Sequence, residues 1–263
     1  MDLRLNSHQA FISGSTQGIG YAIAEGLALE GAAVILNGRT QAGVDDAVRR
    51  LVSAVPGATV SGLAADFADS AQVDALIGAL PDVDVLVNNV GLFGLAPFDD
   101  IPDADWQRYF DINVMSGVRL SRHVLGGMLE RKRGRIIFIG SESGVNIPAD
   151  MLHYGVTKAA MLALSNGLAK LTRGTAVTVN TVLGGPTYSD GVAGAVADIA
   201  QSQSIAVDDL KAAIIGGNQT TLLERFIEPA EIAHLVAYLA SPLSSATNGA
   251  ALRADGGVLT SMI

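Results

Sequence analysis

The chain has no cysteine among its 263 residues and only four histidines. The absence of cysteine excludes disulfide bonds, thiol catalysis and cysteine-based zinc sites. The histidines, His8, His123, His153 and His234, have none of the spacings of a metal-ligating motif. The sequence therefore predicts no metal site.

The chain also has little positive charge and no long apolar run. It carries 17 lysines and arginines against 26 acidic residues, a net charge of −9, and so offers no basic face for nucleic acid. Its apolar runs are much shorter than the roughly 20 residues of a membrane-spanning helix. The first residues lack the pattern of a signal peptide. We expect a soluble, cytoplasmic protein with neither nucleic acid nor membrane as a partner.

Apolar residues and glycine are abundant by contrast. Hydrophobic residues make up 49% of the chain and there are 30 glycines, which is enough to bury a core rather than remain disordered. The mean hydropathy of +0.37 further indicates apolar surface that other subunits cover.

Short apolar runs alternate with longer segments of helical periodicity. Strands are expected at Ala10–Ser13, Ala33–Leu36, Thr59–Leu63, Val83–Val87, Arg135–Ile139, Ala176–Val182 and Ala250–Arg253. Helices are expected at Ile19–Glu30, Gln41–Val55, Ala71–Leu80, Asp103–Arg131, Met151–Arg173 and Pro229–Ala240. This alternation is typical of an α/β, doubly wound, mostly parallel seven-stranded sheet with helices on both faces. No linker divides the chain, so we expect a single domain over residues 1–263.

One segment, residues 187–225, interrupts the alternation after the sixth strand. It contains two weak helical patterns, Val192–Ala200 and Asp208–Ile215. Ligands bind at the carboxyl edge of an open α/β sheet, and long excursions there are usually functional. We therefore expect this segment to be a substrate lid that is mobile without ligand.

The first strand ends in the glycine-rich sequence SGSTQGIG, residues 13–20. Glycines at 14, 18 and 20 allow a tight turn, a close backbone approach and contact between helix and strand. The helix that begins here offers free N–H groups and the positive end of its dipole to a pyrophosphate. The alternative is a glycine-rich turn without a ligand. The turn predicts dinucleotide contacts by Gly14, Ser15, Thr16, Gln17, Gly18, Ile19 and Gly20.

The end of the second strand bears on the choice of cofactor. In NAD-specific proteins an acidic residue here binds the ribose hydroxyls, but this chain has Gly38 at that position, between Asn37 and Arg39. Glycine leaves room for a 2′-phosphate, and a guanidinium can bind it through two hydrogen bonds. We expect NADP(H) to be preferred, with Asn37 and Arg39 at the site. If Arg39 is merely solvated, NAD(H) is used instead.

Polar residues also follow the third and fourth strands. Asp66 could accept a hydrogen bond from the adenine amino group, with the backbone of Phe67 beside it; alternatively it caps the helix that starts near Asp69. Asn89 and Gly91, in the sequence NNVG, are expected to line the adenosine side of the cleft. The alternative for this sequence is a simple turn.

Tyr154 and Lys158 are four residues apart, so they share one face of a helix. A phenol has a pKa near 10, and a nearby ammonium lowers it. The pair could give a proton to a carbonyl oxygen, or take one from an alcohol, while hydride moves at carbon. An ordinary surface pair is the alternative.

Two further side chains complete this candidate site. Ser141 follows the fifth strand, where its hydroxyl could bind the substrate oxygen, and Ser143 is its rival. Asn113, inside an expected helix, could hold a water that links Lys158 to solvent. Because asparagine is mildly unfavourable within helices, a kink or a solvent-facing amide is the alternative.

Taken together, these motifs resemble the short-chain dehydrogenase/reductase family, built as a single Rossmann domain. The matching segments are SGSTQGIG (13–20), NNVG (88–91), Asn113, Ser141, YGVTK (154–158), RFIEPAEIAHLVAYLAS (225–241) and DGG (255–257). The resemblance implies that Tyr154 is the catalytic acid/base and that Lys158 binds the nicotinamide ribose and lowers the tyrosine pKa. It implies Ser141 as the stabiliser of the substrate oxygen and Asn113 as the relay residue. It also implies a homotetramer or homodimer whose long helices pair between subunits.

The chain departs from the family pattern at three places. Ser13 replaces a threonine, Val90 replaces an alanine, and Gly184 stands where the family has proline before Gly185. Loss of that proline frees the backbone and puts in doubt how rigidly the loop holds the nicotinamide. Gly185, Thr187 and Ser189 are still expected to contact the cofactor.

The residues expected around the substrate are mostly apolar. They are Leu92, Phe93, Asn146, Ile147, His153, Leu183 and Tyr188. We expect substrate contacts from Phe93, Ser143 and Tyr188, and a packing role for His153. Such a pocket suits an uncharged ketone or secondary alcohol. The sequence thus predicts an NAD(P)(H)-dependent oxidoreductase acting on such groups. The alternatives are a 3-oxoacyl thioester reductase and a non-catalytic dinucleotide-binding regulator.

Overall fold

The computed structural model of the chain describes residues 2–218 and 220–262. Positions 1, 263 and 219, the last within the expected lid, lie outside the described residues. The strands are β1 (Gln9–Ile12), β2 (Ala33–Gly38), β3 (Val60–Ala64), β4 (Val85–Asn88), β5 (Arg133–Ser141), β6 (Ala176–Gly184) and β7 (Ala251–Ala254). They form one sheet in the order β3-β2-β1-β4-β5-β6-β7 with every pair parallel. The expected doubly wound fold is confirmed.

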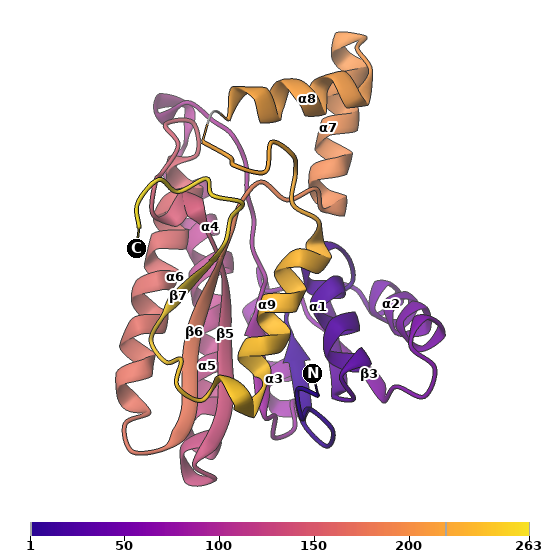
Figure 1. Ribbon diagram of the computed structural model, residues 1–263, viewed down its shortest axis with the longest axis vertical. Coiled ribbons are helices and arrows are strands. Elements are labelled where there is room, and N and C mark those ends of the chain that lie inside the picture. Colours follow the sequence, from indigo (N-terminus) through magenta and orange to yellow (C-terminus); the bar gives the residue numbers. More distant parts are fainter. Residues whose placement is uncertain (1, 219, 263) are drawn as a thin grey trace.

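Helices cover both faces of this sheet (Figure 1). They are α1 (Gly18–Leu29), α2 (Gln41–Ala54), α3 (Ser70–Ala79), α4 (Asp103–Tyr109), α5 (Met115–Glu130), α6 (Leu152–Leu171), α7 (Asp190–Gln203), α8 (Val207–Gly217) and α9 (Pro229–Ala240). Residues of α1, α2 and α9 bury one core against the sheet, and residues of α3, α5 and α6 bury the other. Strands enclosed in this way have few solvent-facing positions, which explains their continuous apolar runs.

Side-chain caps fix where several helices begin. Thr40 accepts the N–H of Gly43 at 3.2 Å at the start of α2. Asp69 accepts the N–H of Ala71 at 2.9 Å at the start of α3, so the interpretation of Asp66 as that cap is wrong. Each cap satisfies an otherwise unpaired backbone donor.

The single helix expected over Asp103–Arg131 is interrupted, which corrects the sequence prediction. One π-helical turn, Phe110–Val114, separates α4 from α5. Turns of this kind insert a residue into the helix and are frequent at functional sites. Asn113 lies in this turn and is fully buried. Because Asn113 is buried, the interpretation of a solvent-facing amide is wrong, while a kink at this position stays a prediction.

The sheet order reverses between β1 and β4, which creates a crevice at their carboxyl ends. The polar ends of β1, β4, β5 and β6 all lie at this edge. Above it, α7 and α8 project away from the sheet at the top of Figure 1. None of the helices within residues 2–218 and 220–262 is long and apolar enough to cross a bilayer.

Candidate active site

The glycine-rich turn between β1 and α1 needs glycine at all three positions. Gly14 and Gly18 have φ angles of +62° and +59°, in the left-handed region that side chains disfavour. A Cβ at Gly20 would overlap the carbonyl oxygen of Gly14 and the side-chain amide of Asn89. The turn therefore requires glycine for its backbone conformation at 14 and 18, and at 20 because the start of α1 packs tightly against it.

Buried polar side chains hold this turn in place. Asn37 accepts the N–H of Gly14 at 2.9 Å and donates to Leu63 at 3.0 Å. Asn89 donates to the carbonyls of Ser13 and Gly14 at 3.0 and 2.8 Å. The Ser13 hydroxyl accepts the N–H of Asn89 at 3.0 Å. Serine at position 13 therefore keeps the hydroxyl group that joins the end of β1 to the end of β4. The side chains of Asn37 and Asn89 thus shape the turn from beneath.

The segment expected to be a lid contacts the glycine-rich turn directly. The N–H of Gly18, at the start of α1, donates to the carboxylate of Asp190 at 2.6 Å. Asp190 is the first residue of α7, and Ser189 before it caps that helix by accepting the N–H of Val192 at 3.5 Å. A carboxylate therefore lies where the helix dipole and free N–H groups favour an anion. No local signal in the sequence pointed to Asp190.

A cavity of about 340 Å³ lies beside the turn, at the end of β2. Its lining residues are Thr16, Arg39, Thr40, Gly43, Asp66 and Gln72. No ion pair joins Arg39 to any described residue, and its side chain is exposed. A Cβ at Gly38 would overlap the methyl group of Thr16, so any side chain there would require Thr16 to move. The side chain of Phe67 is buried in the core, and Phe67 does not line the cavity.

A second arginine, Arg50, approaches the same region from α2. Its guanidinium donates to the carbonyl of Thr16 at 2.6 Å and lies 4.5 Å from the ring centre of Tyr21. Asp46 pairs with it at 3.1 Å. The sequence reasoning missed this contact because it joins residues far apart in the chain.

The end of β5 meets the start of α6 at the candidate reaction centre. Ser141 is the last residue of β5, and Tyr154 and Lys158 lie on the first turns of α6. A Cβ at Gly144 would lie 2.9 Å from the backbone of Lys158, which is why the turn after Ser141 can pack closely on the helix. The buried Lys158 ammonium donates to the carbonyl of Ile139 at 2.8 Å and lies 5.6 Å from the Tyr154 ring centre.

Burial dominates the electrostatics of this pair. It raises the pKa of Tyr154 to about 12, although the nearby Ser141 side chain opposes the rise. Burial also lowers the pKa of Lys158 to about 8, against the opposing charge of Glu142. The lowering of the tyrosine pKa by Lys158, which the resemblance implies, stays a prediction. Burial of the phenol is the largest effect on its pKa, and the Lys158 ammonium is directed at the carbonyl of Ile139.

Asn113 ties three segments together at the base of the centre. Its side-chain oxygen accepts the N–H of Leu92 at 2.6 Å, and its amide donates to the Leu92 carbonyl at 3.0 Å and to the Thr157 hydroxyl at 2.9 Å. Gly91 lies nearby: a Cβ there would lie 3.5 Å from the Lys158 ammonium. These bonds fix the loop after β4 against α6.

The loop after β6 is more firmly held than the missing proline suggested. Gly184 pairs with Ser141 of β5 and with Ala254 of β7. A Cβ at Gly185 would overlap the backbone of Asp255, so glycine is required there. The Thr187 hydroxyl donates to the carbonyl of Gly185 at 2.9 Å.

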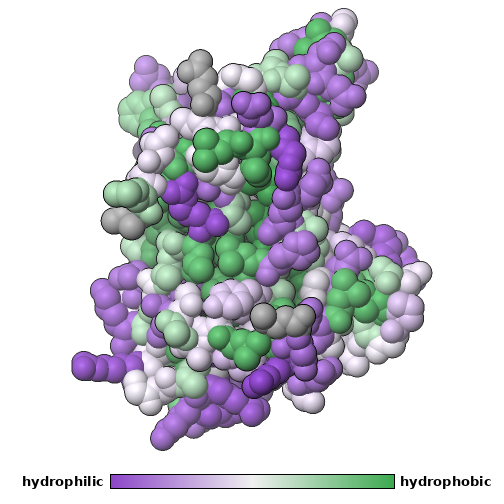
Figure 2. Space-filling view, viewed as in Figure 1, coloured by the Kyte–Doolittle hydropathy of each residue, from purple (hydrophilic) through white to green (hydrophobic). Residues whose placement is uncertain are grey.

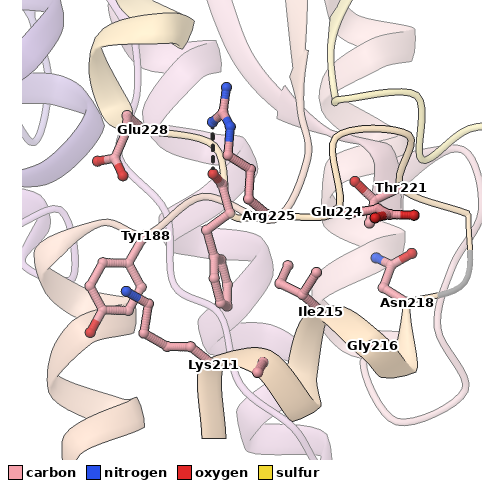
Figure 3. A pocket seen from close by; sticks show the side chains of 11 residues that line it. Tyr188, Lys211, Ile215, Gly216, Asn218, Thr221, Glu224, Arg225 and Glu228 are labelled. Atoms are coloured by element: carbon pink, nitrogen blue, oxygen red, sulfur yellow. Dashed lines mark hydrogen bonds between the residues drawn. The ribbon is translucent and has the colours of Figure 1, made fainter. Parts of the chain in front are cut away.

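The three residues expected to contact the substrate lie in different environments. Ser143 is buried beside Ser141, while half of the Phe93 side chain is exposed. Tyr188 faces a cavity of about 520 Å³ within the lid, beside Lys211 and Arg225 (Figure 3). None of the reaction-centre residues lines that cavity. His153 is buried and stacks on Tyr109 with ring centres 4.0 Å apart, in agreement with a packing role.

The described part of the chain contains no group of three or more histidine and acidic side chains arranged to hold a metal ion. Three features lie along one edge of the sheet: the turn after β1, the cavity at the end of β2, and the cluster of Ser141, Tyr154 and Lys158. This arrangement can cradle a phosphate-bearing ligand at one end and exchange a proton at the other.

Comparisons with known proteins agree with this geometry. A family model described as short chain dehydrogenase matches residues 8–200. The chain is 45% identical to the uncharacterized oxidoreductase YvaG of Bacillus subtilis over the whole of both chains. It is 31% identical to the 3-oxoacyl-(acyl-carrier-protein) reductase FabG of Vibrio cholerae, over 97% of this chain and 99% of that one.

A solved structure is also closely similar. It is L-sorbose reductase from Gluconobacter frateurii complexed with NADPH and L-sorbose, with a TM-score of 0.93, 30% identity and full coverage of both chains. Sequence and structure agree along the whole sheet and its helices. The chain belongs to the short-chain dehydrogenase family of oxidoreductases.

Proposed function

We propose that the protein is an NADP(H)-dependent oxidoreductase that interconverts a carbonyl group and a secondary alcohol. The observation that carries this proposal is the meeting of Tyr154, Lys158 and Ser141 at the carboxyl edge, next to the glycine-rich turn. Family membership makes the chain an enzyme, so the non-catalytic regulator is not retained.

The residues present fit a dinucleotide along this edge. The turn from Gly14 to Gly20 would hold the pyrophosphate, and the cavity with Arg39 and Asp66 would take the adenosine end. Asn89, Gly91 and the loop at Gly185, Thr187 and Ser189 would border the nicotinamide half. When bound, the nicotinamide ring supplies or accepts the hydride.

The chain's own residues manage the proton. In the reductive direction the phenol of Tyr154 donates its proton to the carbonyl oxygen, and the Ser141 hydroxyl orients that oxygen. Lys158, whose ammonium can bind the ribose and face the phenol, stabilises the phenolate that results. Asn113 holds the loop after β4 against α6 next to Lys158, through its bonds to Leu92 and Thr157. In the oxidative direction the same groups act in reverse.

The preference for NADP(H) rests on Arg39, which has no partner among the described residues, and on Gly38, which places no carboxylate where the 2′-phosphate would lie. The L-sorbose reductase that this chain resembles was solved with NADPH. Arg39→Ala should raise the KM for NADPH about 10- to 100-fold, because a charge-assisted pair with phosphate is lost, and leave the KM for NADH within about threefold. Arg49→Ala is the matched control, since Arg49 is exposed and pairs only with Asp46 among the described acids. An equal change in the KM for NADPH and for NADH would show that Arg39 does not bind the 2′-phosphate.

The contact between Asp190 and Gly18 should weaken cofactor binding. A pyrophosphate entering the turn must displace or lie beside a carboxylate, and like charges repel. Asp190→Asn should therefore lower the Kd for NADPH about 3- to 10-fold in a fluorescence titration. Asp208→Asn, in the same lid but facing Lys211 at 3.9 Å, should not change it. Weaker binding by Asp190→Asn would indicate that this carboxylate supports the bound cofactor instead.

The reaction class is tested by a panel of ketones and alcohols with NADPH, NADH and their oxidised forms, followed by ultraviolet absorbance. Cofactor-dependent turnover of uncharged carbonyl compounds is expected. The 31% identity to an acyl-carrier-protein reductase keeps 3-oxoacyl thioesters as the second candidate, so an acyl thioester belongs in the panel. Turnover of thioesters alone would favour that candidate.

We further propose a cytoplasmic homotetramer or homodimer. Apolar residues gather at the centre of the face between β7 and α9 (Figure 2), and Val156 and Leu171 of α6 are 41% and 60% exposed. Surfaces of this kind are commonly covered by another subunit. The mobile lid over residues 187–225 also remains a prediction: α7 and α8 bury only Val196, Ala200 and Ile215 among their described residues.

A further inference from the structure

A carboxylate lies next to the serine that orients the substrate oxygen. Glu142 opens the short helical turn Glu142–Gly144 directly after β5. The Ser141 hydroxyl donates to one of its oxygens at 2.6 Å, and the Ser143 hydroxyl donates to the other at 3.2 Å. Glu142 is half-buried, and its charge acts on both Tyr154 and Lys158. It therefore faces the reaction centre rather than open solvent.

The hydrogen bond between Ser141 and Glu142 uses the only proton of the serine hydroxyl. A hydroxyl has one proton to donate, and Ser141 gives it to Glu142 while accepting the N–H of Ser143 at 3.1 Å. In this state Ser141 has no proton for a substrate carbonyl. A substrate that brings its own hydroxyl group to Glu142 takes over that hydrogen bond and releases the serine proton to the carbonyl oxygen. A simple ketone offers no such donor.

The same carboxylate opposes anionic substrates. The nearby cation, Lys158, is directed at the Ile139 carbonyl. In the lid, the Lys211 ammonium lies 4.2 Å from the ring centre of Tyr188, beside the separate lid cavity in Figure 3. A substrate carboxylate next to the reacting carbon would meet the charge of Glu142 at short range, where repulsion is strong.

We propose that Glu142 is a specificity-determining residue that selects uncharged substrates with a hydroxyl group beside the reacting carbon: hydroxyketones in reduction and vicinal diols or polyols in oxidation. This inference rests on the proposed oxidoreductase function and names its substrate class. The carboxylate accepts the neighbouring substrate hydroxyl, and Ser141 then binds the oxygen that Tyr154 protonates.

Two sets of matched compounds test it. Hydroxyacetone, butan-2-one and pyruvate differ only in the group beside the carbonyl, as do 2-hydroxyacetophenone, propiophenone and phenylglyoxylate. The wild type should reduce each hydroxyketone with a kcat/KM about 10- to 100-fold above that of its alkyl analogue. The keto acid should be the poorest substrate of each set.

Two variants then separate the charge from the shape of the side chain. Glu142→Gln keeps the size, and should lower the hydroxyketone-to-alkyl ratio about tenfold and raise the kcat/KM for the keto acids by a similar factor. Glu142→Ala should remove the preference for hydroxyketones. Asp150→Asn, an exposed acid after the same turn, is the control and should leave both ratios unchanged.

The outcomes are distinct. An equal loss of kcat/KM for all six compounds in Glu142→Gln would mean a structural role only and overturn the inference. A wild type that prefers the alkyl ketones or the keto acids would also overturn the inference. The same holds for a wild type that reduces other carbonyl compounds of the panel but neither hydroxyketone. In both cases the proposed function would stand. A wild type that reduces no carbonyl compound with either cofactor would overturn the proposed function itself.

Discussion

Replacing Tyr154 with phenylalanine should lower kcat about 10³-fold or more in both directions while leaving the Kd for NADPH within about twofold. The substitution removes only the hydroxyl, so the ring keeps its packing 5.6 Å from the Lys158 ammonium. Without the phenol, a carbonyl oxygen that gains negative charge has no acid placed to protonate it. Steady-state kinetics and a fluorescence titration of the cofactor measure the two effects separately.

Tyr238→Phe provides the control for this experiment, because Tyr238 lies on α9 and 39% of it is exposed. It should leave kcat and thermal stability unchanged. A Tyr154→Phe variant that keeps more than about a tenth of the wild-type kcat would show that another group moves the proton. Loss of cofactor affinity together with kcat would instead indicate a collapsed site.

Much of this site could be predicted because its determinants are local. The glycines at 14, 18 and 20 must follow β1 directly, and the Tyr154–Lys158 spacing needs one helix. Parallel strands place all their carboxyl ends at one edge, so residues that end separate strands meet without any knowledge of packing. For that reason the residues predicted after β1, β2, β4 and β5 lie along one edge.

What the sequence could not predict depends on distant contacts and burial. Asp190 meets Gly18 across 172 positions of the chain, and no local pattern indicates that. The rise of the Tyr154 pKa follows from the burial of its phenol. Glu142 has no signal of its own: only its 2.6 Å contact with Ser141 gives it a function.

Replacing Lys158 with methionine should abolish turnover and stabilise the fold. The lysine is buried with only 4% of its surface exposed, and burial lowers its pKa from 10.5 to about 8. The difference between these values corresponds to a penalty of about 3 kcal/mol near pH 7. Methionine fills similar space without charge, while the unpaired Ile139 carbonyl costs about 1–2 kcal/mol. A net gain of about 1–2 kcal/mol should raise Tm by a few degrees.

The sign of the pH dependence separates this explanation from improved packing. Between pH 8 and 10.5 the unfolded chain holds the lysine proton more tightly than the folded one, so the wild type gains stability as pH rises through that window. The advantage of Lys158→Met over the wild type should therefore be largest at pH 7 and be reversed at pH 10.5, where the burial penalty is almost gone and the Ile139 carbonyl is still unpaired. Urea unfolding at both pH values measures it, with exposed Lys170→Met on the same helix as the control. A Lys158→Met variant that is less stable than the wild type at pH 7 would contradict this explanation. It would mean that the hydrogen bond from Lys158 to Ile139 contributes more to stability than burial of the ammonium costs.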